Sequence, residues 1–141
     1  MKSQFILIPK IIISSRTIKK WFGRTGFQRV VVLETELDYY SELLGDNIVV
    51  PSSFISDGAS VPKMFWNIYP PFGKYLESAL VHDYYYHLGR LGKAPVTKST
   101  ADKIFREAMK VQGVGIFTRN LMYRVVSANL IAKYKTNEDT D

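Results

Sequence analysis

Runs of apolar, often β-branched residues dominate the first third of the chain. They occupy residues 5–13, 29–35 and 47–54, and each contains several isoleucines or valines. Runs of this length and composition, bounded by turn-forming residues, are typical of β-strands. The residues expected to form the turns are Ser14 with Ser15, residues 23–26, and Gly45 with Asp46. The pattern therefore predicts an N-terminal part built from antiparallel strands.

The spacing of apolar residues changes to a helical period in the second half. It predicts helices over residues 74–88, 99–112 and 116–135, and Gly89 and Gly113 follow the first two as typical helix terminators. Strands followed by helices indicate the α+β class. A chain of 141 residues fits one domain. We expect residues 1–56 to be mainly β, residues 57–136 mainly helical, and residues 137–141 to form an acidic tail.

Composition narrows the class of protein. The chain is 46% hydrophobic and 23% charged, which are ordinary values for a globular protein. It has no cysteine, which excludes disulfides and thiolate metal sites. No apolar segment approaches the roughly 18 residues that span a bilayer. Pro9 and Lys10 split the first apolar run, so we predict neither a signal peptide nor a transmembrane segment.

The net charge of +6 is unevenly distributed. The 33 residues before Glu34 contain seven basic residues and no acid, whereas residues 34–46 contain five acids and no base. A basic segment of this kind can bind an acidic partner, or it can be a solvated face of the strands. Nucleic acid is a disfavoured partner because no recognised binding motif accompanies the charge.

The pair His82-Asp83 is the first candidate for chemistry. Leu76, Ala79, Leu80 and Asp83 follow the i, i+3, i+4, i+7 spacing, so Asp83 falls on the apolar stripe of the predicted helix. His82 lies about 100° around the same helix and can border the same cleft. One interpretation pairs Asp83 with a hard cation while His82 deprotonates a water molecule. The other makes both residues satisfied polar groups of a helix.

Two further acids have the same double interpretation. Asp102 follows Ser99 by three residues, which resembles a capping box, yet it also shares a face with Phe105 and can orient His82. Asp57-Gly58 reads as a tight turn, and also as a loop whose carboxylate binds a cation. Oxygen ligands of this kind favour calcium or magnesium over zinc.

The ordered motifs resemble a small phage- and prophage-associated family of unknown function. Its pattern is VPxGFxTDGASxPxxFW, then HDxLY, then ADxxFxxxM. The residues here that follow it are Val50, Pro51, Phe54, residues 57–60, Pro62, Phe65, Trp66, His82, Asp83, Tyr86, Ala101, Asp102, Phe105 and Met109. Ser53, Ser56 and Tyr85 depart from it. The resemblance implies a location in the virion or in the host cytoplasm.

A more distant resemblance is to prokaryotic phospholipases of the A2 type. It rests on Asp57-Gly-Ala-Ser60, then His82-Asp83, then Tyr86, then Ala101-Asp102 with Phe105 and Met109. The resemblance implies that the helical part is similar to the phospholipase core, with His82 as the general base and Asp102 as its orienting partner. It also implies Asp83 and Asp57 as calcium ligands, with Ser60 and Tyr86 as further motif residues. Ala59 and Ala79 stand where that family has two half-cystines, and the β-rich first third is foreign to it.

Three functions remain open at this point. The first is a calcium-assisted hydrolase acting on a lipid of the cell envelope or on another ester or amide. The second is a non-catalytic phage structural or tail-associated protein, which contacts other phage proteins and uses the same residues as a polar hub. The third is a small inhibitor of a host protein that binds through basic residues including Lys19, Lys20 and Arg24. An enzyme loses turnover but keeps its fold in His82→Ala, whereas a structural hub loses stability.

Overall fold

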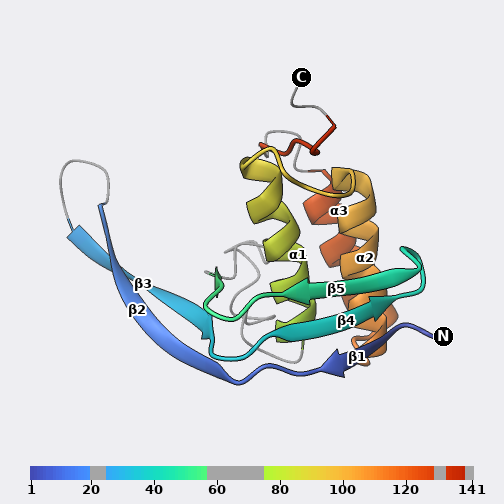
Figure 1. Ribbon diagram of the computed structural model, residues 1–141, viewed down its shortest axis with the longest axis horizontal. Coiled ribbons are helices and arrows are strands. Elements are labelled where there is room, and N and C mark those ends of the chain that lie inside the picture. Colours follow the sequence, from blue (N-terminus) through green and yellow to red (C-terminus); the bar gives the residue numbers. More distant parts are fainter. Residues whose placement is uncertain (20–24, 57–74, 129–132, 139–141) are drawn as a thin grey trace.

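The computed structural model describes residues 1–19, 25–56, 75–128 and 133–138. Antiparallel strands come first and three helices follow, so the chain belongs to the α+β class as predicted (Figure 1). The strands are β1 (Gln4–Leu7), β2 (Ile11–Lys19), β3 (Thr25–Leu33), β4 (Leu37–Ser41), β5 (Asp46–Val50) and β6 (Ile55–Ser56). The helices are α1 (Leu76–Arg90), α2 (Lys98–Val111) and α3 (Ile116–Ser127).

The strands form two small antiparallel sheets. One has the order β1-β4-β5 and the other the order β2-β3-β6. The β2–β3 pairing runs from Ile11 opposite Leu33 to Lys19 opposite Thr25, and this long ribbon extends away from the helices (Figure 1). The β4–β5 hairpin turns through Gly45, whose φ of +71° is a conformation that glycine adopts without strain. That turn brings the segment before Gly45 close to α2.

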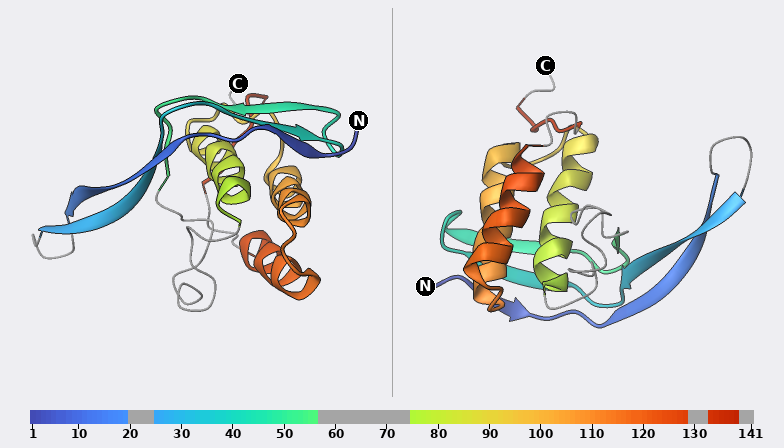
Figure 2. Two further views of the ribbon diagram at one scale, coloured as in Figure 1. Left: turned by 90° about the horizontal axis from the view of Figure 1, so that it is seen from below. Right: turned by 180° about the vertical axis from the view of Figure 1, so that it is seen from behind.

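The core lies between the β1-β4-β5 sheet and the helices α1 and α2. Alternate residues of β4, Leu37 and Tyr39, are buried, as expected for a strand with one covered face. They pack in one cluster with Leu80 of α1 and Ile104 of α2. Burying one such large apolar side chain stabilises the fold by about 1.5–3 kcal/mol. Helix α3 lies on the side of α2 away from the sheet (Figure 2).

The strand boundaries differ from the prediction in several places. Strand β3 begins at Thr25, within the predicted turn 23–26, and β5 covers Asp46–Val50 where the prediction was residues 47–54. The predicted strand over residues 5–13 is interrupted, because β1 ends at Leu7 and Pro9, which has no N–H to donate, separates it from β2. Ser14 and Ser15 are not a turn: they lie inside β2, opposite Val30 and Arg29. Strand β4 was not predicted at all, since its segment was considered only for its acids.

The helix boundaries also correct the prediction. Helix α3 ends at Ser127, and the backbone N–H of Lys135 bonds to the carbonyl of Gly89 instead of continuing a helix. Helix α1 passes through Gly89 and ends at Arg90. Gly89 is required there for another reason, since a Cβ at this position would overlap the ring of Tyr134. Among the described helices, none is long and apolar enough to cross a membrane.

Candidate functional site

The helices α1 and α2 bring His82 and Asp102 into direct contact. Nε2 of His82 lies 2.7 Å from Oδ1 of Asp102, and each side chain is only 1% exposed. Leu80 and Val81 of α1 and Ile104 of α2 belong to the core, so both backbones are fixed around the pair. The two residues lie 20 apart in the sequence, and the packing of the two helices is what joins them.

Asp102 accepts two further hydrogen bonds. The hydroxyl of Tyr86, one turn after His82 on α1, donates to Oδ1 at 2.6 Å. The ammonium group of Lys98, one turn before Asp102 on α2, donates to Oδ2 at 2.9 Å and also to the carbonyl of Val126 on α3 at 2.9 Å. The carboxylate therefore has a donor on both oxygens. Its partners link all three helices.

These donors determine the charge state of Asp102. Burial acts to raise the pKa of its carboxyl, but the hydrogen bonds from His82, Tyr86 and Lys98 lower it and outweigh burial. The net result is a pKa below the usual value, so Asp102 is an anion at neutral pH. Burial also raises the pKa of the Tyr86 phenol, and its bond to Asp102 raises it further. Tyr86 is therefore a neutral donor.

The ring of His82 is held between two aromatic side chains. It stacks on Phe105 with centroids 4.6 Å apart, and the Tyr86 ring lies 4.2 Å away. Because the ionised Asp102 can only accept, the bond between them places a proton on Nε2 of His82. In a neutral imidazole with its proton on Nε2, Nδ1 is the basic nitrogen. The arrangement fits a positioned general base.

Asp83 lies on the same helix and has a separate environment. Its side chain is 8% exposed, and its Oδ2 accepts a hydrogen bond from the hydroxyl of Ser56 at the end of β6. A buried carboxylate beside a hydroxyl is the oxygen chemistry that a hard cation prefers. Within the described ranges, however, no three acidic or histidine side chains are grouped to hold a metal ion. Asp57 and Ser60, the other predicted motif residues, lie outside the described residues.

The capping interpretation of Asp102 is wrong. The N-cap of α2 is Thr97, whose hydroxyl accepts from the backbone N–H of Thr100, and Ser99 lies inside the helix. Threonine at this position is a favourable cap. Asp102 directs its side chain to His82, Tyr86 and Lys98 instead.

Sequence reasoning missed two residues of this site. Lys98 precedes Asp102 by four residues, and this i, i+4 spacing of a base and an acid is a signal that the sequence did contain. Ser56 was noted only as a departure from a motif. Its contact with Asp83 depends on where β6 meets α1, which no local pattern reveals.

Comparison with known proteins gives one match. A family model described as "Protein of unknown function (DUF1353)" matches residues 31–126. That range includes strands β4 to β6, all of α1 and α2 and most of α3, and therefore the whole network around Asp102. No curated protein and no solved structure matches the chain.

Proposed function

Since the chain belongs to the DUF1353 family, whose function is unknown, we propose a function from its site: a hydrolase in which His82 is the general base and Asp102 positions it. The observation that carries the proposal is the 2.7 Å hydrogen bond between Nε2 of His82 and Oδ1 of Asp102. An imidazole fixed by a buried carboxylate is the standard way to keep one tautomer and one orientation.

In the proposed reaction His82 takes a proton from water at Nδ1 while the water oxygen bonds to the carbonyl carbon of the substrate. The imidazolium then returns that proton to the leaving group as the ester or amide bond breaks. Asp102 keeps its negative charge throughout, because the pKa of its carboxyl is below the usual value. That charge stabilises the imidazolium. Tyr86 and Lys98 hold the carboxylate in place.

Asp83 has a different role in this proposal. Asp83 would hold calcium together with Asp57, and such an ion would supply positive charge to stabilise an oxyanion. The support from the described residues is the buried carboxylate and the hydroxyl of Ser56 beside it. The substrate class that follows from the resemblance to phospholipases is a lipid ester of the cell envelope.

The first experiment measures hydrolysis of phosphatidylcholine and phosphatidylglycerol vesicles and of a short-chain aryl ester, with millimolar calcium. We expect His82→Gln to lower turnover by about 100-fold or more, the usual contribution of a general base. His87→Gln is a matched control, because His87 lies on the same helix and is half-buried against Phe54. Equal turnover in wild type and His82→Gln, both folded by circular dichroism, would contradict the proposal.

The second experiment measures calcium binding by calorimetry on wild type and Asp83→Asn, with magnesium as the control ion. Loss of a calcium heat in the variant supports the metal-assisted mechanism. A folded wild type that binds no calcium contradicts the calcium part. The role of His82 is then tested by turnover alone.

A non-catalytic function is the alternative that one observation favours. Lys98 bonds both Asp102 on α2 and the carbonyl of Val126 on α3, so the same network joins the helices as a structural hub. In a phage structural or tail-associated protein, this network would serve only to join the helices. This alternative predicts that His82→Gln loses stability, whereas the hydrolase predicts that it loses turnover with the fold retained.

The inhibitor function rests on the basic N-terminal segment. Lys20 and Arg24 lie outside the described residues. The inhibitor function therefore stays a prediction from charge alone. Its test is whether charge reversal at Lys19, Lys20 and Arg24 abolishes binding to an acidic host protein.

A further inference from the structure

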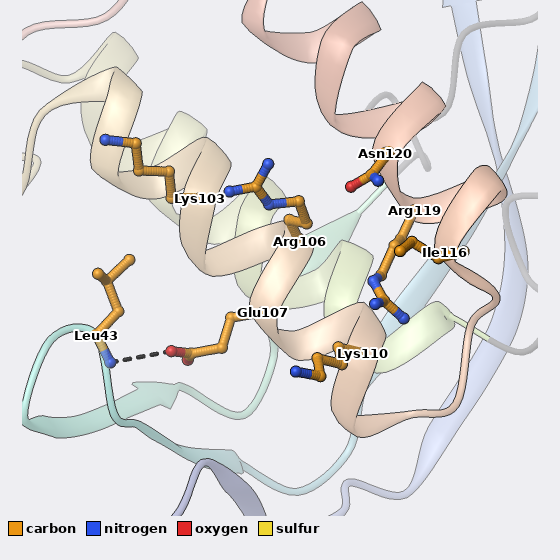
Figure 3. A pocket seen from close by; sticks show the side chains of 8 residues that line it. All are labelled: Leu43, Lys103, Arg106, Glu107, Lys110, Ile116, Arg119 and Asn120. Atoms are coloured by element: carbon orange, nitrogen blue, oxygen red, sulfur yellow. Dashed lines mark hydrogen bonds between the residues drawn. The ribbon is translucent and has the colours of Figure 1, made fainter.

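A second site lies on the face of α2 that is turned away from α1. It is a groove of about 370 Å³ between α2, the first turns of α3 and the segment before Gly45. Figure 3 shows the long side chains of Lys103, Arg106 and Arg119 around it. It shares no residue with the network around Asp102.

The groove concentrates positive charge. Lys103, Arg106 and Lys110 line it from α2 at the i, i+3, i+7 spacing, so they form one row along the helix. With a rise of about 1.5 Å per residue, that row is about 10 Å long. Arg119 lines the facing side from α3. Four cations therefore share one concave surface.

Acidic side chains do not balance this charge. The only acid of the lining is Glu107, so one negative charge stands against four positive ones, and both oxygens of Glu107 accept from uncharged donors. Oε1 accepts from the Tyr39 hydroxyl at 2.7 Å. Oε2 accepts from the backbone N–H of Leu43 at 2.9 Å (Figure 3). In the part of the chain that the structure describes, none of the four cations forms an ion pair with a carboxylate.

Both arginines are held in place by uncharged groups. The guanidinium of Arg106 lies over the Tyr123 ring, with Cζ 4.1 Å from the centroid. Arg119 donates from Nη1 to the carbonyl of Val114 at 3.1 Å. These contacts hold each guanidinium group in place and leave its positive charge unneutralised, so each can bind an anion through its remaining N–H groups.

The backbone of α3 adds to the positive electrostatic potential of the groove. The first turn of α3 contains no acidic residue, and its N-cap, Gly115, has no side chain to bond the first N–H groups. Ile116 and Arg119 of that first turn line the groove. The positive end of the α3 dipole therefore lies beside the row of cations.

We infer that this groove binds a small soluble ligand carrying two or more phosphate groups. Arginine forks match phosphate oxygens in pairs, and a row of cations about 10 Å long spans more than one phosphate. A groove of about 370 Å³ between two helices has room for a compact anion of this kind, so we choose it over a duplex nucleic acid or a bilayer, and the test below compares all three. A single phosphate engages part of the row and binds more weakly.

The test uses calorimetry with inorganic tripolyphosphate on the full chain, without calcium, at low and moderate salt. We expect saturable binding that weakens as salt rises, since exposed charges are screened. Inorganic phosphate should bind at least about tenfold more weakly, because it loses one or more charge-assisted bonds. No saturable binding of tripolyphosphate to the folded chain would overturn the inference.

Matched variants locate the site. Lys103→Gln and Arg119→Gln should each weaken tripolyphosphate binding by about tenfold, the loss of one charge-assisted contact. Lys103 is exposed and makes no hydrogen bond within the described residues, so its variant keeps the fold even if Arg119→Gln does not. Arg124→Gln, on an exposed position of α3 outside the groove, should bind as the wild type does. Equal weakening in all three variants would overturn the assignment to the groove.

Two further arms distinguish other polyanions. Phosphatidylglycerol vesicles and a DNA duplex are each tested for binding and for displacement by tripolyphosphate. Displacement of either one supports the groove as the shared phosphate site. Binding to vesicles or duplex that tripolyphosphate does not displace, in a chain that binds no tripolyphosphate, would replace the inference with a membrane or nucleic-acid surface.

Discussion

Asp102 and Lys103 are neighbours in the sequence and point about 100° apart on α2, into two regions that handle charge differently. On the side toward α1, Asp102 is 1% exposed and its oxygens accept from His82, Tyr86 and Lys98. On the other side, the lysines of the groove are exposed and its arginines half-buried, with no carboxylate paired to any of them in the described chain. A buried charge needs partners within the protein because desolvation is costly, whereas a cluster of exposed charges is stable in water without them. We therefore expect the network around Asp102 to contribute to the stability of the fold, and the groove to contribute to ligand binding.

Removing the buried carboxylate should have the largest effect. Asp102→Ala leaves His82, Tyr86 and Lys98 without their acceptor, so we expect the free energy of unfolding to fall by about 3–5 kcal/mol, as for other broken buried ion pairs. Urea denaturation followed by circular dichroism at neutral pH measures it. Glu36→Ala, at an exposed acid, is the control and should change stability by less than about 0.5 kcal/mol. A loss below about 1 kcal/mol in Asp102→Ala would mean that the network does not couple to folding.

The pH dependence should follow from the same carboxyl. Its pKa in the folded chain is below the ordinary value of 3.8, so its ionised form is favoured by folding. The stabilisation is thus fully present above about pH 5 and is lost as the pH falls through 3.8 toward the lowered pKa. We expect the stability gap between wild type and Asp102→Asn to shrink as the pH falls from about 5 into the acid range in thermal melts. A gap that stays constant over that range contradicts the lowered pKa.

The two regions also differ in how much of them the sequence reveals. The helical period located α1 and α2, and the order of motifs selected His82, Tyr86 and Asp102, which the fold brings into one network. The groove could not be predicted, because Arg119 joins the α2 cations only through the packing of α3 on α2. Its charges lie on two helices with no shared motif.

The strands also differ in whether local sequence or pairing with a distant strand determines their structure. In β4 the buried residues Leu37 and Tyr39 alternate with Asp38 and Tyr40, which is a readable strand pattern that the acids obscured. Ser14 and Ser15, in contrast, are turn-forming residues by local preference. Their place inside β2 follows from pairing with a strand some fifteen residues away, and local preference does not encode it.

Removing one tyrosine hydroxyl from each region compares them directly. Tyr86→Phe takes a donor from the buried Asp102, and we expect a loss of about 1–1.5 kcal/mol, typical of a hydrogen bond to a charged or buried group. Tyr39→Phe takes a donor from Glu107, whose carboxylate is less buried than that of Asp102, so the loss should be about 0.5–1 kcal/mol. Urea denaturation measures both. Equal losses, or a larger loss in Tyr39→Phe, would show that burial of the acceptor does not set the difference.

Neutralising one cation of the groove should have the smallest effect. Lys110 is exposed, and it lies on the same helix face as Arg106 with no carboxylate paired to it in the described chain. Lys110→Gln removes like-charge repulsion, but Lys110 also lies in the last turn of α2, where the helix dipole stabilises a cation. Because the two contributions oppose each other, we expect stability to change by less than about 0.5 kcal/mol at low salt. The change should vanish near 1 M salt, where the screening length is only about 3 Å. Thermal melts of wild type and Lys110→Gln across a salt series measure it. A loss of about 1.5 kcal/mol or more at low salt would mean that Lys110 has a partner within the folded chain, and that the groove is neutralised internally like the region around Asp102.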